Sequence, residues 1–181
     1  MVYESSRAGG WAAGAGEVPA PLRLYDVAVP AEWVDYNEHM SEWCYLLVMG
    51  NNSDAFFRYL GIDEEYRAAG ASLFTVETHI RNLDEASRGD RLHLALRVLA
   101  HDEKRVHVTH EVSRIDGGVI ATGEQMLLHV DTRRDRVAPI PAVLRQRLSQ
   151  IVASHSALPC PDWVGRVMGI PGHTGRRVET G

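Results

Sequence analysis

Two periodicities divide the chain. Residues 21–30 and four segments between residues 72 and 130 alternate apolar and polar positions, the period of two that is typical of β-strands. Residues 42–60 instead repeat at helical spacing, and two lines run along them. The first is Trp43, Leu46, Leu47, Gly50, Asp54 and Phe57, and the second is Tyr45, Met49, Phe56 and Leu60. Because this helix is apolar over most of its girth, we expect other elements to wrap around it.

Shorter elements complete the order. Asp63 is a helix cap and Gly70 a stop, which predicts a short second helix, and residues 141–155 form a final amphipathic helix. The segments "EASRGD", "HDEK" and "DGG" separate the strands with turn chemistry. The order of strand, long helix, short helix, four strands and helix predicts an α+β fold, an antiparallel sheet wrapped around a long central helix.

The domain boundaries follow composition. Residues 1–20 are rich in Gly and Ala without periodicity, which is typical of a disordered leader. Residues 21–155 hold all the periodic segments and form one domain, as expected from a length of 181 residues. Residues 156–181 are rich in Pro and Gly and predict an irregular C-terminal tail.

Composition excludes several functions. The net charge of −5 offers no basic footprint for nucleic acid. No apolar run reaches the roughly 18 to 20 residues of a membrane span, and no signal peptide is recognisable, so we expect a cytoplasmic protein without membrane contact. Cys44 and Cys160 lack metal-ligand spacing, and the histidines are scattered, so we expect reduced cysteines and no metal.

The stretch "WVDYNEHMSEW", Trp33 to Trp43, is unusually polar for the entrance of a buried helix. It holds acids, an amide and a histidine, and Ser41 is a good helix cap. Two interpretations are open: an ordinary helix entrance whose carboxylates make local backbone bonds, or the place where chemistry occurs.

This stretch carries a resemblance to a family. "VDYNEHM" resembles the D-x-N-G-H-x-N entrance of hotdog-fold acyl-CoA thioesterases, and "GDRLHLALRVLAHDEKRVHVTHEV" with "IATGEQMLLHVD" resembles the strands that complete that fold. Residues 21–135 share the resemblance, and the most similar subgroup is the betainyl-CoA thioesterases associated with carnitine dehydrogenase. The resemblance implies a hotdog fold, hydrolysis of a short polar acyl-CoA in carnitine catabolism, no cofactor beyond the CoA of the substrate, and a homodimer or dimer of dimers.

The chain departs from the family pattern at Glu38. Many members have glycine between the asparagine and the histidine, where it allows a left-handed backbone at low cost. Glu38 therefore bears on the loop geometry and on the role of Asp35.

The resemblance assigns catalysis to Asp35, Asn37 and His39. Asp35 would act as general base or as nucleophile, Asn37 would orient the substrate, and His39 would hold Asp35 or bind the thioester. Backbone N–H groups at the start of the long helix would polarise the carbonyl oxygen. Asp54 or Glu77 could replace Asp35, with a solvated helix face as the ordinary explanation of Asp54.

Further residues are expected to bind the substrate. Aromatic faces can hold a quaternary ammonium through cation–π attraction, and Glu124 is expected on a core-facing line near the site. The predicted substrate-binding residues are Trp33, Tyr36, Ser41, Trp43, Tyr45, Phe74 and Glu124. The predicted contacts to the CoA phosphates are Arg81, Arg88 and Arg105, with Lys104 as a weaker candidate.

Two other functions remain open. A hotdog dehydratase of 3-hydroxyacyl thioesters needs an Asp and a His about five residues apart with a small residue at the helix start, whereas Asp35 and His39 are closer and Glu38 is large. A non-catalytic hotdog module would bind acyl-CoA or only dimerise.

Overall fold

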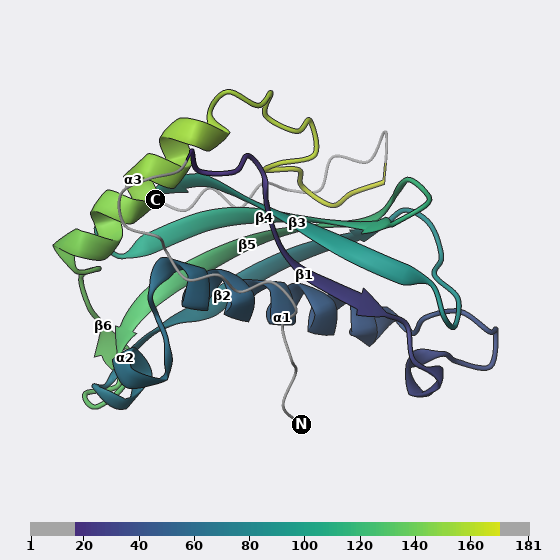
Figure 1. The fold of residues 1–181 in the computed structure, drawn as a ribbon, viewed down its shortest axis with the longest axis horizontal. Helices are drawn as coiled ribbons and strands as arrows, with labels where there is room; N and C mark the ends of the chain where they lie inside the picture. The colour runs from purple at the N-terminus through teal and green to yellow at the C-terminus, as the bar shows by residue number, and fades with distance from the viewer. Residues whose placement is uncertain (1–16, 171–181) are drawn as a thin grey trace.

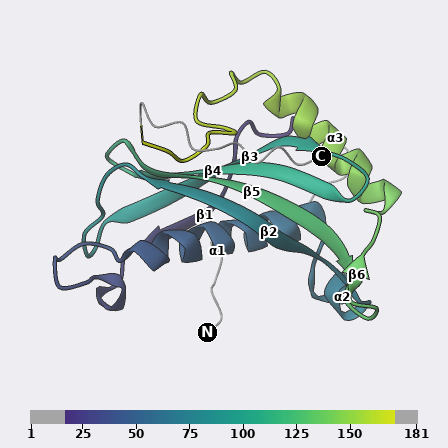
Figure 2. The same cartoon turned by 180° about the vertical axis from the view of Figure 1, so that it is seen from behind.

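The computed structural model describes residues 17–170, so most of the predicted leader and the end of the predicted tail lie outside the described residues. One sheet curves around a long helix, as Figures 1 and 2 show from opposite sides. The elements are β1 Leu22–Ala28, the 3-10 turn η1 Ala31–Trp33, α1 Glu42–Leu60, α2 Glu64–Ala68, β2 Ala71–Asn82, β3 Arg91–His101, β4 Arg105–Arg114, β5 Val119–Asp131, β6 Arg136–Val137 and α3 Ala142–His155. No helix in this part of the chain is long and apolar enough to cross a membrane.

The sheet is antiparallel, with the strand order β1-β3-β4-β5-β2 and β6 paired to β5. The predicted α+β class and the wrapped central helix are confirmed. The long strands and the three helices match the periodic segments of the sequence, whereas η1 and β6 are too short for a periodicity to show.

The inner face of the sheet packs on α1 through small and apolar residues. A Cβ added to Gly123 would lie 2.5 Å from Sδ of Met49, so the Met49 side chain of α1 fills the space that glycine leaves on β5. The second apolar line of α1 is buried, including Met49 and Phe56. The first line is not: Trp43 is 58% and Leu46 48% exposed, and Gly50 faces open space. The expectation that both lines are covered is therefore wrong for one chain alone.

A polar cluster is enclosed between α1 and the inner face. His110 on β4 is fully buried, and its Nδ1 lies 3.0 Å from Nδ2 of Asn52. Its Nε2 lies 3.1 Å from Oε1 of Gln125, which also accepts from the Ser53 hydroxyl at 3.0 Å. The amide is a donor to Nδ1 and the Gln125 oxygen an acceptor from Nε2, so His110 is the neutral tautomer with its proton on Nε2. The polar "NNSD" run of the helix is explained in part by this cluster.

The helix α3 covers the edge of β3 that β1 leaves free. β1 pairs with β3 only as far as Leu96, and beyond it the N–H of Val98 donates to Nδ1 of His155 at 2.9 Å. Nε2 of His155 donates to the carbonyl of Pro19. The buried ring thus satisfies an edge N–H group and ties the start of the domain to its last helix.

We predict that His110 makes the fold sensitive to acid. Burial lowers the pKa of His110 from 6.5 to about 4. The unfolded chain therefore binds a proton more readily, so the stability that neutral His110 contributes is complete above about pH 6.5 and is lost as the pH falls to about 4. The difference corresponds to about 3 kcal/mol.

Urea unfolding at several pH values measures this effect. The free energy of unfolding should fall less between pH 6.5 and pH 4.5 in His110→Gln than in the natural protein. His79→Gln, on the outer face, is the matched control and should keep the full pH dependence. Equal slopes in all three proteins would contradict the assignment.

Candidate active site

Residues 33–41 form a short β-ribbon that leads into α1. The N–H of Ser41 donates to the Trp33 carbonyl at 2.8 Å, and the N–H of Asp35 donates to the His39 carbonyl at 3.0 Å. An isolated bridge joins Val34 to Met40 between these two bonds. The ribbon therefore fixes Asp35 at a set distance from the first turn of the helix.

The tip of the ribbon is a tight turn. Oδ1 of Asp35 accepts the N–H of Asn37 at 2.7 Å, and the Asp35 carbonyl accepts the N–H of Glu38 at 3.1 Å. Glu38 has a φ of 64°, the left-handed conformation that favours glycine. Glu38 thus adopts a conformation that glycine would adopt at lower cost.

The first turn of α1 is open at its N-terminus. Ser41 is the cap residue, but its side chain makes no capping hydrogen bond. The N–H groups of Glu42 and Trp43 have no acceptor inside the helix because of helical geometry. They carry the positive end of the helix dipole and can bind an anionic or polarised oxygen.

A loop between β2 and β3 supports the ribbon. The N–H of Met40 donates to the Ala86 carbonyl at 2.6 Å, and His39 pairs with Ser87 in an isolated bridge. Nε2 of His39 lies 3.1 Å from Oε2 of Glu85. His39 thus contacts a loop carboxylate, and within the described residues no hydrogen bond or ion pair joins its ring to the Asp35 carboxylate.

Asp84 in the same loop was not among the sequence candidates. It pairs with Arg114 of β4, and this pairing lowers the pKa of its carboxyl group below the ordinary value. The carbonyl of Asp84 also accepts from the hydroxyl of Tyr45 at 3.4 Å. Asp84 and Glu85 lie in the run "NLDEASRGD". Because that run has the composition of an ordinary turn, the sequence did not distinguish these acids from other loop residues.

The predicted aromatic residues divide into two groups. Trp33 and Tyr45 are buried against the core, whereas Trp43 and Tyr36 are exposed at the helix entrance. All four lie at the ribbon end of the molecule, where Arg88 of the supporting loop is also exposed. The exposed pair is thus available to an incoming molecule, and the buried pair holds the ribbon in place.

Other predicted residues lie elsewhere. Phe74 is near the start of β2, at the opposite end of that strand from the ribbon. Arg105 begins β4 at that same far end, beside Lys104, and pairs with Asp102 at 2.6 Å. Arg81 lies on the outer face, opposite Thr122 of β5. One chain therefore does not bring these residues to Asp35.

The expected core-facing position of Glu124 is wrong. Gly123 faces α1, so the alternation of the strand turns Glu124 to the outer face. There Oε1 lies 2.8 Å from Nε2 of His107, and Oε2 accepts the N–H of Gly165 at 2.8 Å. Glu124 is a hydrogen-bonded, half-buried carboxylate as expected, but on the opposite face.

The alternative carboxylates are also placed. Asp54 lies on α1 and pairs with Arg58 at 2.5 Å, one turn further along the helix, and more distantly with Arg67 at 4.0 Å. Glu77 is exposed on β2, in the outer row with Met126 and His107. Neither side chain lies at the ribbon or at the N-terminus of α1.

This arrangement suits chemistry at a polarised carbonyl. The ribbon that carries the Asp35 carboxylate leads directly into the uncapped first turn of α1, a helix that is itself anchored in the core. A carboxylate can activate water or attack carbon, and the N–H groups can stabilise a developing oxyanion. Within the described residues, no group of three or more His, Cys, Asp or Glu side chains could hold a metal ion, and the catalytic assignments remain predictions.

Comparison with known proteins identifies related sequences. A model of the Thioesterase-like superfamily matches residues 29–148. An Agrobacterium fabrum protein named L-carnitine dehydrogenase/betainyl-CoA thioesterase is 41% identical over 179 residues, which cover 91% of this chain and 37% of that protein. The chain thus spans just over a third of that relative's length.

Two further similarities cover nearly the whole of the related chain. A Pseudomonas aeruginosa protein named betainyl-CoA thioesterase is 41% identical over 152 residues, 83% of this chain and 96% of the relative. A crystal structure of a candidate thioesterase from Pseudomonas putida KT2440 has a TM-score of 0.75 and 34% identity, and covers 85% of this chain and 99% of the other. The hotdog fold expected from the sequence is therefore confirmed.

We predict that Glu38→Gly stabilises the protein. Glycine adopts a φ of 64° without the steric penalty of a Cβ, so the free energy of unfolding should rise by about 1 kcal/mol. Asp135→Gly is the matched control, since Asp135 has a φ of 48° but aspartate tolerates this region better. Denaturant unfolding should show a larger gain in the free energy of unfolding for Glu38→Gly than for Asp135→Gly. A loss of stability in Glu38→Gly would contradict the inference that Glu38 is strained.

Proposed function

The chain belongs to the thioesterase-like superfamily, and from this premise we propose that it is an acyl-CoA thioesterase acting on a short polar acyl-CoA, specifically betainyl-CoA in carnitine catabolism. One observation carries the proposal: the ribbon that holds Asp35 leads directly into the uncapped first turn of α1. The relatives' names supply the acyl group. The proposed reaction needs no cofactor besides the CoA of the substrate, and we place it in the cytoplasm, where CoA thioesters are made and used.

The proposed mechanism uses both parts of the site. The N–H groups of Glu42 and Trp43 polarise the thioester carbonyl and stabilise the oxyanion that forms. Asp35 either removes a proton from the attacking water or attacks the carbonyl carbon itself and is then released by water. The C–S bond breaks, CoA leaves as a thiolate that takes up a proton, and the acyl group leaves as a carboxylate. No strong general acid is needed, because a thiolate is a good leaving group.

The supporting residues have secondary roles in this proposal. Asn37 is held by its backbone bond to Asp35 and can present its amide to the substrate. His39 positions the ribbon through Glu85. The exposed faces of Trp43 and Tyr36 are available to the quaternary ammonium of a betainyl group, with an attraction of about 1 kcal/mol for each well-placed ring.

We also propose that the site is completed in a homodimer. β2 is an edge strand, and two of its apolar side chains are exposed, Val76 at 56% and Phe74 at 50%. The line of α1 at Trp43 and Leu46 is a second exposed apolar surface, uncovered within one chain. A long apolar edge favours pairing with another strand. In an antiparallel β2 pair, Phe74 and Arg105 of the partner subunit lie at the end nearer to this chain's ribbon.

The CoA phosphates have one exposed candidate at the ribbon itself. Arg88 lies in the loop that supports His39, and it has no ion pair within residues 17–170. Its guanidinium can bind phosphate oxygens in a bidentate manner. Arg81 and Arg105 are further from the ribbon in one chain, so their contribution to this proposal depends on the partner subunit.

We predict that Asp35→Asn strongly reduces thioesterase activity. The amide keeps the size and part of the turn geometry but loses the negative charge, so kcat should fall by about 10²- to 10⁴-fold. Release of free CoA thiol from betainyl-CoA, with acetyl-, benzoyl- and medium-chain acyl-CoAs for comparison, measures the change. Asp54→Asn is the matched control and should keep activity, because Asp54 lies mid-helix and pairs with Arg58.

The outcomes separate the possible functions. Loss of activity in Asp54→Asn but not in Asp35→Asn would keep the thioesterase and move its catalytic carboxylate. Absence of thiol release from every acyl-CoA, with acyl-CoA still bound, would favour a non-catalytic binding module.

We predict that a charge at the β2 edge breaks the dimer. Val76→Lys and Leu46→Lys each place an ammonium in the proposed apolar interface, and the dissociation constant should rise by at least about tenfold. Light scattering after size-exclusion chromatography measures the mass. Ile115→Lys, at the exposed turn after β4, is the matched control and should leave the mass unchanged. If both interface variants stay dimeric, the dimer uses another surface.

A further inference from the structure

The segment after α3 lies over the outer face of the sheet, the face opposite α1 (Figures 1 and 2). We call residues 156–167 the strap. Nη2 and Nη1 of Arg97 donate to the carbonyls of Leu158 and Pro159, both at 2.6 Å. Further along, Glu124 accepts the N–H of Gly165. Charged side chains of the sheet thus hold the strap by its backbone at two places.

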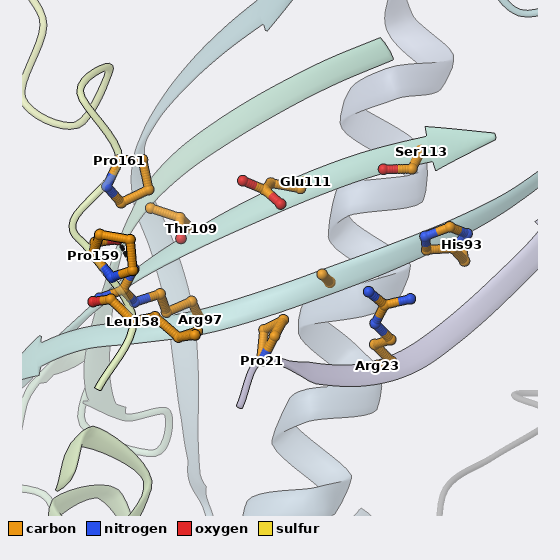
Figure 3. Close-up of a pocket in the computed structure, with 11 residues that line it drawn as sticks. Pro21, Arg23, His93, Arg97, Thr109, Glu111, Ser113, Leu158, Pro159 and Pro161 are labelled. Atoms are coloured by element: carbon orange, nitrogen blue, oxygen red, sulfur yellow. Dashed lines mark hydrogen bonds between the residues drawn. The ribbon is translucent and has the colours of Figure 1, made fainter. Parts of the chain in front are cut away.

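The strap closes one side of a cavity of about 280 Å³. β1, β3 and β4 form its floor, and Figure 3 shows Glu111 between the strap prolines on one side and His93 with Ser113 on the other. The cavity is lined by Pro21, Arg23, His93, Ala95, Arg97, Thr109, Glu111, Ser113, Leu158, Pro159 and Pro161. This volume lies just below the range of about 300 to 1,000 Å³ that is usual for small-molecule sites.

Opposite charges face this cavity without pairing to each other. Within the described residues, Arg23, His93 and Glu111 have no hydrogen bond or ion pair made by their side chains. Nε of Arg97 is buried beside them and also has no hydrogen-bond partner. A half-buried carboxylate without a partner is unfavourable, so the cavity is electrostatically suited to a ligand.

The sheet register explains why Arg23 and Glu111 do not meet. Both flank Ala95, since Arg23 pairs with Ala95 on one side and Glu111 pairs with Ala95 on the other. Alternate strands lie about 10 Å apart, too far for a direct contact of side chains that stand upright on the sheet. A molecule that carries a cation and an anion a few bonds apart can span this distance above the small Ala95 side chain.

We propose that this cavity is a second ligand site that binds a free α-amino acid with a small apolar side chain. The amino-acid carboxylate binds the fork of Arg23, and the ammonium donates to Glu111. The hydroxyls of Thr109 and Ser113 can accept the remaining ammonium N–H groups. Leu158 and the prolines of the strap contact the side chain.

The same lining discriminates against a quaternary ammonium. A trimethylated nitrogen has no N–H to donate, and apart from the His93 ring the cavity has no aromatic side chain to offer it a π-face. The site is therefore distinct in chemistry from the proposed thioester site, and it does not depend on the thioesterase proposal.

Calorimetric titration of the full chain with L-valine tests the site. The matched probes are 3-methylbutanoate, which is valine without the ammonium, 2-methylpropylamine, which is valine without the carboxylate, and glycine betaine, which lacks N–H donors. Valine should bind at millimolar or lower concentration, and each probe should bind at least about tenfold more weakly. Equal binding of valine and 3-methylbutanoate, or no binding of valine, would overturn the proposal.

Variants locate the binding. Glu111→Gln and Arg23→Gln should each weaken valine binding by at least about tenfold, while Arg136→Gln, an exposed arginine on β6, should leave it unchanged. Asp35→Asn should also retain valine binding, which separates this site from the thioester site. Unchanged affinity in both Glu111→Gln and folded Arg23→Gln would contradict the assignment, and Arg23 is exposed enough for its variant to fold.

Discussion

The packing of α1 against the inner face of the sheet is the constraint on which the rest of the fold depends. Met49 lies where a side chain on Gly123 would have to be, so at this point the Met49 side chain alone fills the space between the helix and β5. A sheet that wraps a helix this closely has to curve, and its inner face is then occupied by one helix along its length. The polar cluster around His110 lies inside the same contact, where each ring nitrogen finds a partner on α1 or β5. Hydrogen bonds of this kind require one register of the helix against the sheet, whereas apolar contacts alone would tolerate small shifts.

The same packing leaves the start of α1 free to carry chemistry. The helix begins beyond the strands, next to the ribbon of residues 33–41, which the loop before β3 holds by backbone hydrogen bonds. Ser41 does not cap the first turn with its side chain, so the dipole of a nineteen-residue helix ends at open N–H groups. The rigid core therefore positions the helix terminus, and a short turn positions the carboxylate. A turn with Glu38 in a left-handed conformation is less stable than one with glycine, and strain of this kind is most often tolerated next to a functional site.

Sequence periodicity predicted the elements well because strands and helices repeat their burial along the chain. It failed where burial depends on a partner or on a single residue. Trp43 and Leu46 follow the helical pattern as clearly as Met49 and Phe56, yet only the second pair is covered within one chain. Glu124 was assigned to the wrong face because alternation alone does not say which set of residues points inward, and the close approach at Gly123 decides it. The Asp35 ribbon could be located from its motif, but the contact of His39 with Glu85 joins residues of two loops that no local pattern connects.

The outer face carries the residues that the inner face cannot accommodate. With α1 filling the concave side, charged side chains of β3, β4 and β5 have to point outward, and the strap then covers part of them. Arg97 and Glu124 satisfy backbone groups of the strap, which itself forms neither helix nor strand in the described residues. Arg23 and Glu111 do not pair with each other, because β3, the strand that carries Ala95, lies between their two strands. A surface that uses some of its charges to fix a covering segment, and leaves others unpaired beneath its edge, has the composition of a binding site rather than that of a solvated face.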